Sequence, residues 1–396
     1  MKRLLLATAA TALVAGVAAA EDVKIGNVTG FTGGIESLAP QIAAGAELAM
    51  SEVNASGKAM NGWNFIAVRG DDTCTDASAA TAAAERLVSA EGVKGIVGGS
   101  CSGVTRAMLT NVAMPNGIVM ISPSATSPAL TDDPDDGLFF RTAPSDAREG
   151  DVASDILLER GAKSIAISYS NSDFGKGEAE FIAKYFTEKG GVVTISASHD
   201  DGKADYSAEV SALASAGGDV LVVAGYLDQG GKGIIQAALD TGAFSTFYLP
   251  GGMIGESLPQ AIGPALDGSY GDITSSDAEG NAMLKDIAAK ATPPFDSGSA
   301  YSSEAYDAAA LIMLAMQAAG STDSKVYKDK VMEVANAPGE KINPGELGKA
   351  LELISQGVDI DYQGATGVEM VEPGEAAGRY REVLVKDGQN TTVKYR

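Results

Sequence analysis

Short apolar runs alternate with alanine-rich segments of helical periodicity along this chain, and the alternation occurs in two series. The strand-like runs lie at 23–28, 64–70, 93–99 and 117–123 in the first series and at 164–170, 191–198, 219–226 and 246–250 in the second. The helical patterns lie at 40–57, 76–92, 175–190, 206–218 and 230–242, and another helix begins within 98–107. Apolar runs that lack polar alternation are typical of parallel strands buried on both faces. The sequence therefore predicts an α/β fold with two lobes, each a mainly parallel sheet flanked by helices.

The remaining segments predict how the two lobes are joined. Residues 139–146 ("FFRTAPSD") lie between the two series, and their extended pattern predicts a crossing strand. Residues 281–290 and 303–320 are helical without an equal number of strands, so we expect them to pack back on the first lobe. The stretch 381–396 alternates like a terminal hairpin. A chain that returns to its first lobe predicts a cleft between the lobes, where small ligands bind.

The first twenty residues predict export. Lys2 and Arg3 precede an apolar stretch that ends in the small residues Ala18 and Ala20, a pattern typical of a secretory signal peptide cleaved after Ala20. No later segment reaches the roughly 18 to 20 apolar residues that a membrane span needs, so we expect a soluble periplasmic protein. Removing Lys2 and Arg3 leaves 27 basic and 52 acidic residues, a formal charge of −25 that repels nucleic acid and anionic lipid surfaces.

The two cysteines, Cys74 and Cys101, predict one disulfide, because an exported chain meets an oxidising compartment. A cysteine or serine nucleophile would need a base, and the only histidine is His199, in a separate polar stretch. A secreted hydrolase using Ser100, Cys101 or Ser102 is therefore a rival hypothesis without a G-x-S-x-G turn to support it. One histidine and two paired cysteines also predict no zinc site, and we expect no metal and no cofactor.

Two hydroxyl-rich loops follow neighbouring strands of the predicted first lobe. The stretch 98–107 ("GGSCSGVTRA") carries Ser100 and Ser102 between glycines, and 121–131 ("ISPSATSPALT") adds further hydroxyls. At the carboxyl ends of parallel strands, free helix N–H groups and hydroxyls favour an anion, in particular a carboxylate. The alternative for Ser102 is that it only caps its helix.

The order and spacing of these motifs resemble the periplasmic leucine/isoleucine/valine-binding proteins, the type I solute receptors of ABC importers. The similarity extends over nearly the whole chain after residue 20. The markers are "EDVKIGNVTGFTG" at 21–33, "GDDTC" at 70–74, "GGSCSGVT" at 98–105, "ISPSATSPALT" at 121–131, "FRTAPSD" at 140–146, "SDFGKG" at 172–177, "AGY" at 224–226 and "DYQGATG" at 361–367.

This resemblance implies a two-lobe type I periplasmic-binding-protein fold with three hinge crossings. The crossings are expected near 142–146, 270–274 and 378–383. The resulting division is a signal peptide at 1–20, an N-lobe at 21–143 plus 273–380, and a C-lobe at 144–272 plus 381–396. The family's disulfide matches Cys74 and Cys101. The resemblance also implies a monomer that is not an enzyme and that closes on its ligand before docking on an inner-membrane permease.

The resemblance further implies which residues bind the ligand. Ser102 and Thr126 match the family's carboxylate-binding serine and threonine, with backbone groups at Ser124 contributing. Phe174 and Tyr226 follow strands of the second lobe and are expected to face the cleft. The predicted ligand-binding residues are Ser100, Cys101, Ser102, Ser124, Ala125, Thr126, Phe174, Tyr226 and Tyr301.

Two positions depart from the family pattern. The acid that holds a ligand ammonium in leucine-type members is replaced by Gly251, and an aromatic contact is replaced by Leu38. A buried ammonium without a countercharge is costly, so either another acid is recruited or the ligand lacks an ammonium. The candidates for a replacement acid are Asp228, Glu256, Glu304 and Glu36.

The sequence thus predicts the solute-binding component of an ABC importer that captures a small carboxylate-bearing solute by lobe closure, with a branched-chain or other apolar amino acid as the expected ligand. One alternative keeps the fold but binds an amide, an aromatic acid or another organic acid without an ammonium group. Another alternative is a ligand-sensing module for a membrane receptor.

Overall fold

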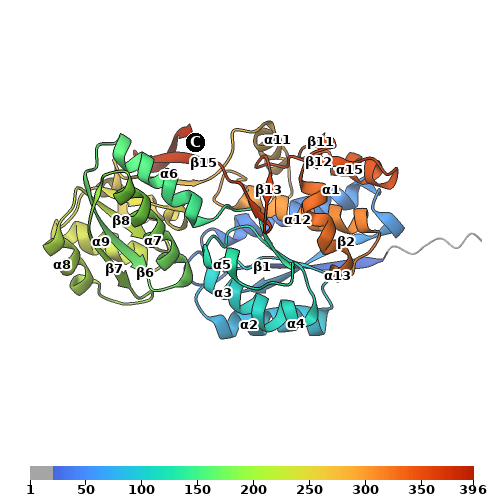
Figure 1. Cartoon of the computed structure of the whole chain (residues 1–396), viewed down its shortest axis with the longest axis horizontal. Coiled ribbons are helices and arrows are strands. Elements are labelled where there is room, and N and C mark those ends of the chain that lie inside the picture. Colours follow the sequence, from blue (N-terminus) through green and yellow to red (C-terminus); the bar gives the residue numbers. More distant parts are fainter. Residues whose placement is uncertain (1–20) are drawn as a thin grey trace, which may run out of the picture.

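The computed structural model describes residues 21–396, and the signal peptide predicted at 1–20 lies outside the described residues. The chain forms two lobes, each built on a seven-stranded sheet, with a further two-stranded sheet of β11 (Glu340–Ile342) and β12 (Ile360–Tyr362). Figure 1 shows that the middle of the chain, in green and yellow, makes one lobe, whereas the blue and orange segments make the other. The predicted α/β two-lobe fold is confirmed.

The sheet of the first lobe has the order β13-β14-β5-β4-β3-β1-β2. Its pairs are parallel except β13 with β14, and β1 lies between β2 and β3. The strands are β1 (Asp22–Thr29), β2 (Asn64–Asp71), β3 (Ile96–Val97), β4 (Met120–Ser122), β5 (Phe139–Arg141), β13 (Met370–Val371) and β14 (Glu375–Ala376).

The sheet of the second lobe repeats this arrangement in the order β16-β15-β10-β9-β8-β6-β7. The five strands from β6 to β10 are parallel, and β15 and β16 form the antiparallel hairpin that the sequence predicts for the last residues. The strands are β6 (Ser164–Ser170), β7 (Val192–His199), β8 (Val220–Ala224), β9 (Phe247–Leu249), β10 (Tyr270–Thr274), β15 (Tyr380–Lys386) and β16 (Gln389–Tyr395).

Helices cover the sheet of the first lobe. They are α1 (Ala39–Ser56), α2 (Ala77–Glu85), α3 (Ser102–Met108), α4 (Met114–Asn116), α5 (Ala129–Asp132), α11 (Glu279–Ala288), α12 (Ser302–Ala319), α13 (Ser324–Tyr327), α14 (Val331–Ala335) and α15 (Leu347–Ser355), with π-helical turns continuing α2 over Arg86–Glu91 and α3 over Leu109–Ala113. Asp76 is the N-cap of α2 and accepts hydrogen bonds from two backbone N–H groups of this helix. Helix α12 is almost entirely buried and packs on α1, where Gly45 admits the backbone of Ser302.

The helices of the second lobe are α6 (Asp146–Glu159), α7 (Asp173–Glu188), α8 (Ser207–Ala216), α9 (Gly230–Thr241) and α10 (Ser257–Ile262). The first two pack against each other. Each begins at a serine N-cap, Ser145 for α6 and Ser172 for α7, so both start where the preceding strand of a sheet has just ended. The N-termini of α6 and α7 therefore lie close together.

The chain passes between the two sheets after β5, after β10 and after β14. Residues 270–274, near which a crossing is expected, form strand β10, paired with β9 and β15 in the second sheet, and the chain leaves this sheet after Thr274. Most of the expected crossing at 378–383 is likewise strand β15, and the short link before it is 377–379. The exact lobe boundaries stay a prediction, and the sheet strands overrun them by at most two residues. Among residues 21–396, no helix has the length and apolarity to cross a membrane.

Candidate functional site

In both sheets the chain reverses its strand order beside the first strand, β1 in one lobe and β6 in the other. Ligands of such open parallel sheets bind beyond the carboxyl ends of the strands at this point of reversal. The loops after β3 and β4 in the first lobe, and after β6 and β8 in the second, contain most of the residues that the sequence predicts for the site.

The loop after β3 is fixed by the disulfide between Cys74 and Cys101, which confirms the predicted pairing. Asp72, fully buried and missed by sequence reasoning, accepts hydrogen bonds from the backbone N–H groups of Ser100 (2.7 Å) and Cys74 (2.9 Å). It thus ties together the same two loops that the disulfide joins. Burial raises the pKa of the Asp72 carboxyl to about 6.

The loop after β4 packs directly on the loop after β3. The Ser124 hydroxyl donates to the backbone oxygen of Ser100 at 2.8 Å, and the Ser102 hydroxyl oxygen accepts the backbone N–H of Ser127 at 3.1 Å. Helix α3 starts at Ser102, so the N–H groups of its first turn have no partner within the helix. Backbone donors and hydroxyls therefore converge where the sequence predicts a carboxylate.

Side chains of both lobes meet in one inter-lobe pocket. Its lining residues are Ile35, Ser100, Cys101, Ser102, Ser124, Phe174, Tyr226, Gly252 and Tyr301. The rings of Phe174 and Tyr226 lie 5.3 Å apart across a 32° tilt and form its second-lobe wall. The pocket encloses about 20 Å³, enough for roughly one water molecule. An amino acid therefore needs more room than this pocket provides.

Seven of the nine predicted ligand-binding residues line this pocket. Ala125 and Thr126 are buried beside it without lining it, while Ile35 and Gly252 line it without having been predicted. Ile35 precedes α1 in the loop where the sequence pointed to Glu36 and Leu38, and Leu38 lines a wider crevice of about 420 Å³ at the edge of the lobes. Apolar residues in a glycine-rich loop carry no local signal that separates pocket lining from core.

The four acids proposed as ammonium partners lie outside the lining of the inter-lobe pocket. Asp228 accepts hydrogen bonds across the lobes from the backbone N–H (2.9 Å) and hydroxyl (2.7 Å) of Ser37. Glu36 and Glu256 are exposed. Glu304 is buried and accepts a hydrogen bond from the Thr274 hydroxyl at 3.1 Å, and burial raises the pKa of its carboxyl to about 8.

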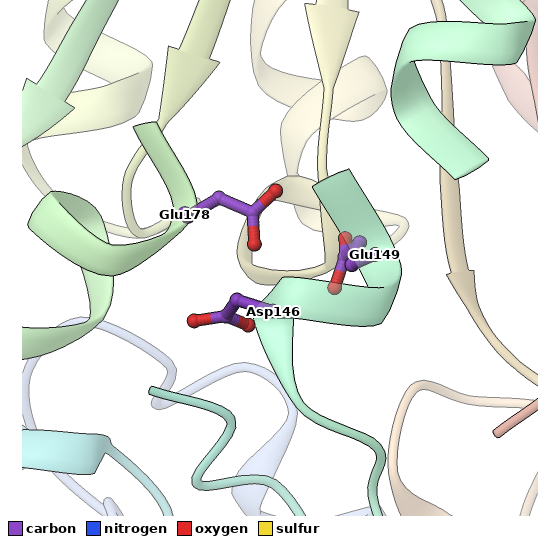
Figure 2. Close-up of side chains that lie close together, drawn as sticks. All are labelled: Asp146, Glu149 and Glu178. Atoms are coloured by element: carbon purple, nitrogen blue, oxygen red, sulfur yellow. The ribbon is translucent and has the colours of Figure 1, made fainter. Parts of the chain in front are cut away.

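Three other carboxylates, which sequence reasoning missed, lie next to the pocket. Asp146 and Glu149 come from the first turn of α6 and Glu178 from α7, and Figure 2 shows Glu178 pointing toward the two residues of α6. One oxygen of each lies within 4.8 Å of the others, and all three side chains are buried. We call these residues the acidic triad. Acids in a first helical turn are common, since they offset the helix dipole, so spacing alone did not mark them as a site.

The acidic triad meets the pocket at Gly251. Its backbone N–H donates to Glu149 Oε1 at 2.7 Å. A methyl group added to Gly251 would lie 2.7 Å from the Tyr301 hydroxyl and 3.4 Å from Glu149 Oε1. The position at which the sequence lacks an acid is therefore reached by the carboxylate of Glu149.

His199 stands apart from the pocket. It lies on β7, its Nδ1 is 2.9 Å from the Ser168 hydroxyl, and burial lowers the pKa of its imidazole. The structure therefore does not bring it together with Ser100, Cys101 or Ser102 as the hydrolase hypothesis requires.

Comparison with known proteins gives a consistent result. The profile of the family described as periplasmic binding protein matches residues 22–337. The Leucine-, isoleucine-, valine-, threonine-, and alanine-binding protein of Pseudomonas aeruginosa is 29% identical over 352 residues, covering 88% of this chain and 91% of that protein.

Solved structures share the fold. A branched-chain amino acid transporter substrate binding protein from Streptococcus pneumoniae, in complex with isoleucine, matches with a TM-score of 0.76 and 22% identity, covering 94% of this chain and 100% of that one. A solute binding protein of an ABC transporter from R. palustris, in complex with 4-hydroxybenzoate, matches with a TM-score of 0.76 and 18% identity, covering 95% and 97%. Two neighbours of the same architecture thus hold chemically different carboxylates.

Proposed function

This chain belongs to the periplasmic binding proteins, and from that premise we propose that it captures an apolar amino acid, such as a branched-chain one, between its lobes and delivers it to an inner-membrane permease. Its class is that of substrate-binding proteins of ABC transporters, which bind solutes and are not enzymes, so the hydrolase hypothesis is excluded. The family name places its work in the periplasm.

The observation that carries the proposal is the convergence of both lobes on one pocket. The Ser102 hydroxyl, which accepts a hydrogen bond from Ser127, and the N–H groups of the first turn of α3 suit a carboxylate, and the rings of Phe174 and Tyr226 suit an apolar side chain. Contacts to the second lobe exist only when the lobes are closed. The solute therefore stabilises the closed form by its differential affinity for that form.

A second candidate is a ligand without an ammonium group, such as an aromatic acid. Gly251 in place of an acid favours it, and the R. palustris neighbour in complex with 4-hydroxybenzoate has the same fold. The pocket lining itself contains no charged side chain among the described residues.

Thermal melting of the protein over a panel of solutes tests the proposal. The protein is unfolded and refolded under non-reducing conditions to remove carried-over ligand. It is then melted with leucine, isoleucine, valine, alanine and threonine, with their hydroxy-acid analogues, and with benzoate and 4-hydroxybenzoate. A true ligand at about 100 times its Kd stabilises by about 2.7 kcal/mol. Stabilisation by the apolar amino acids supports the proposal, whereas stabilisation by the aromatic acids alone establishes the second candidate.

A further inference from the structure

The acidic triad of Asp146, Glu149 and Glu178 is an unusually dense group of buried charge. Their exposed fractions are 0%, 3% and 0%. Both carboxylate oxygens of Asp146 and both of Glu178 are buried and have no hydrogen-bond partner within residues 21–396. Burying an ionised carboxylate without a partner costs free energy. Three carboxylates with oxygens within 4.8 Å of one another are therefore stable only when they hold protons or a cation.

The surroundings of the acidic triad supply no counterion. No salt bridge joins any of its members to a lysine or arginine of the described chain. The titratable and charged groups that face it from neighbouring elements are Asp272 on β10, Tyr248 on β9, Tyr226 after β8, Tyr301 before α12, Tyr380 on β15 and Arg141 on β5. The Arg141 guanidinium does not bind the acidic triad, because it pairs with Glu375 and donates to the backbone oxygens of Ala125 and Ser127.

The acidic triad is separated from the inter-lobe pocket only by the segment at Gly251 and by the side chain of Tyr301. Tyr301 lines the pocket, and its hydroxyl and Glu149 Oε1 both come within 3.4 Å of the point where a Gly251 side chain would begin. Gly252, the next residue, also lines the pocket. Glu149 is thus the member of the acidic triad nearest to this end of the pocket, on the far side of Gly251 and Tyr301.

We infer that the acidic triad is a binding site for the ammonium group of the captured solute, with Glu149 as the first contact and Asp146 and Glu178 completing the negative site. The inference rests on the proposed function, since it assigns the cationic end of an amino acid whose carboxylate is held by the Ser100 to Ser102 loop. It names a class of solute, zwitterionic amino acids, and excludes simple organic acids.

Binding at this site exchanges protons for the ammonium group. Burial raises the pKa of Asp146 to about 6 and raises the pKa values of Glu149 and Glu178 well above their ordinary range, so without a cation the acidic triad keeps its protons to a higher pH than free carboxyl groups do. The arriving ammonium favours the ionised carboxylates, and the displaced protons leave to solvent. Amino-acid affinity therefore increases as pH rises.

The test compares Glu149→Gln, Glu178→Gln and Asp146→Asn with the wild type. Each amide has nearly the shape of the acid and lacks its charge. In Glu149→Gln the amide oxygen can still accept the N–H of Gly251, so we expect the variants to fold and melt near the wild type. Glu180→Gln is the matched control, because Glu180 is exposed on the same helix as Glu178. Calorimetry uses leucine and 2-hydroxy-4-methylpentanoate, which differ only in the ammonium group, in two buffers of different ionisation enthalpy.

The inference predicts that leucine binds the wild type with net release of protons. The hydroxy acid is expected to bind the wild type with an affinity lower by about tenfold or more. The amide variants are expected to lose about tenfold or more of the leucine affinity, whereas Glu180→Gln keeps it. If leucine and the hydroxy acid bind with equal affinity and the amide variants keep the wild-type affinity, the acidic triad does not bind the ammonium group. The protein would then be a receptor for carboxylates in general. If calcium or manganese alone raises the melting temperature of the wild type but not that of Glu178→Gln, the acidic triad is a metal site and not an ammonium site. If neither the amino acids nor the organic acids bind, the proposed function fails together with the inference.

Discussion

At the scale of single residues, the pocket is built from side chains that already satisfy one another. The Ser102 hydroxyl oxygen accepts an N–H from Ser127, and Asp72 accepts N–H groups from both disulfide-linked loops. These bonds hold donors in place before any solute arrives, so little ordering is required on binding.

Replacing Ser102 by alanine tests the carboxylate cradle. The hydroxyl is expected to donate to the ligand carboxylate, and a hydrogen bond to a charged group contributes about 1.5–3 kcal/mol. We expect Ser102→Ala to weaken binding by about tenfold or more in titration calorimetry. The control is Ser215→Ala, an exposed hydroxyl on α8. Equal affinities in the two variants would remove Ser102 from the site.

Glu304 gives stability a distinctive pH dependence. Burial raises the pKa of its carboxyl from an ordinary 4.5 to about 8. In that window the unfolded chain is ionised while the folded protein keeps its proton, so the wild type loses stability as pH rises from 4.5 to about 8. Glu304→Gln lacks this loss, so the melting temperature of the variant minus that of the wild type should increase as pH rises from 4.5 to about 8. A difference in melting temperature between the two proteins that is the same at every pH would show that Glu304 does not titrate in this way.

Sequence reasoning located the pocket residues better than it located the acids. Phe174 and Tyr226 stand beside recognisable strand ends, whereas Glu178 lies four residues beyond Phe174 and is separated from Asp146 by 32 positions. Only the packing of α6 on α7 brings these acids together. Asp228 seemed a candidate for the ligand because it follows Tyr226 closely, but in the structure its oxygens bind Ser37 and Ser257.

At the scale of elements, the loop before α1 and the loop after β8 hold the lobes together. Asp228 of the second lobe accepts two hydrogen bonds from Ser37 of the first, and its backbone N–H donates to the Gly34 oxygen at 3.1 Å. On the other side, the Ser127 hydroxyl donates to the Asp173 backbone oxygen at 3.1 Å. Closure is therefore stabilised at two edges by contacts that need no ligand.

Removing the Ser37 hydroxyl should weaken the closed form. An exposed hydrogen bond of this kind contributes about 1 kcal/mol, which corresponds to roughly a fivefold loss of solute affinity. We expect Ser37→Ala to bind more weakly in calorimetry while melting at the wild-type temperature in the absence of solute. An affinity identical to the wild type would mean that the Ser37–Asp228 contact does not stabilise closure.

The order of helices and strands was predictable where periodicity was strong, as in α1, α7 and β6. The strand β10 was not predicted, because Tyr270–Thr274 reads YGDIT and lacks the apolar run that marks the other parallel strands. Its pairing with β15, more than a hundred residues further on, leaves no local mark in the sequence.

At the scale of the whole molecule, three passages of the chain join lobes that also meet through hydrogen bonds at two edges and through apolar side chains at the pocket. Such a connection permits rigid rotation of one lobe against the other. We expect the radius of gyration, measured by small-angle X-ray scattering, to decrease when a stabilising solute from the melting panel is added. A radius that stays constant on saturation would argue that solute enters without parting the lobes.

The three passages also have a consequence for how the protein is made. The first sheet is completed by β13 and β14, and the second by β15 and β16, all within residues 370–395. Neither sheet is therefore complete before this one short stretch of the chain has been made and has folded. The completion of one lobe is thus tied to that of the other, because neighbouring strands supply the last edge of each.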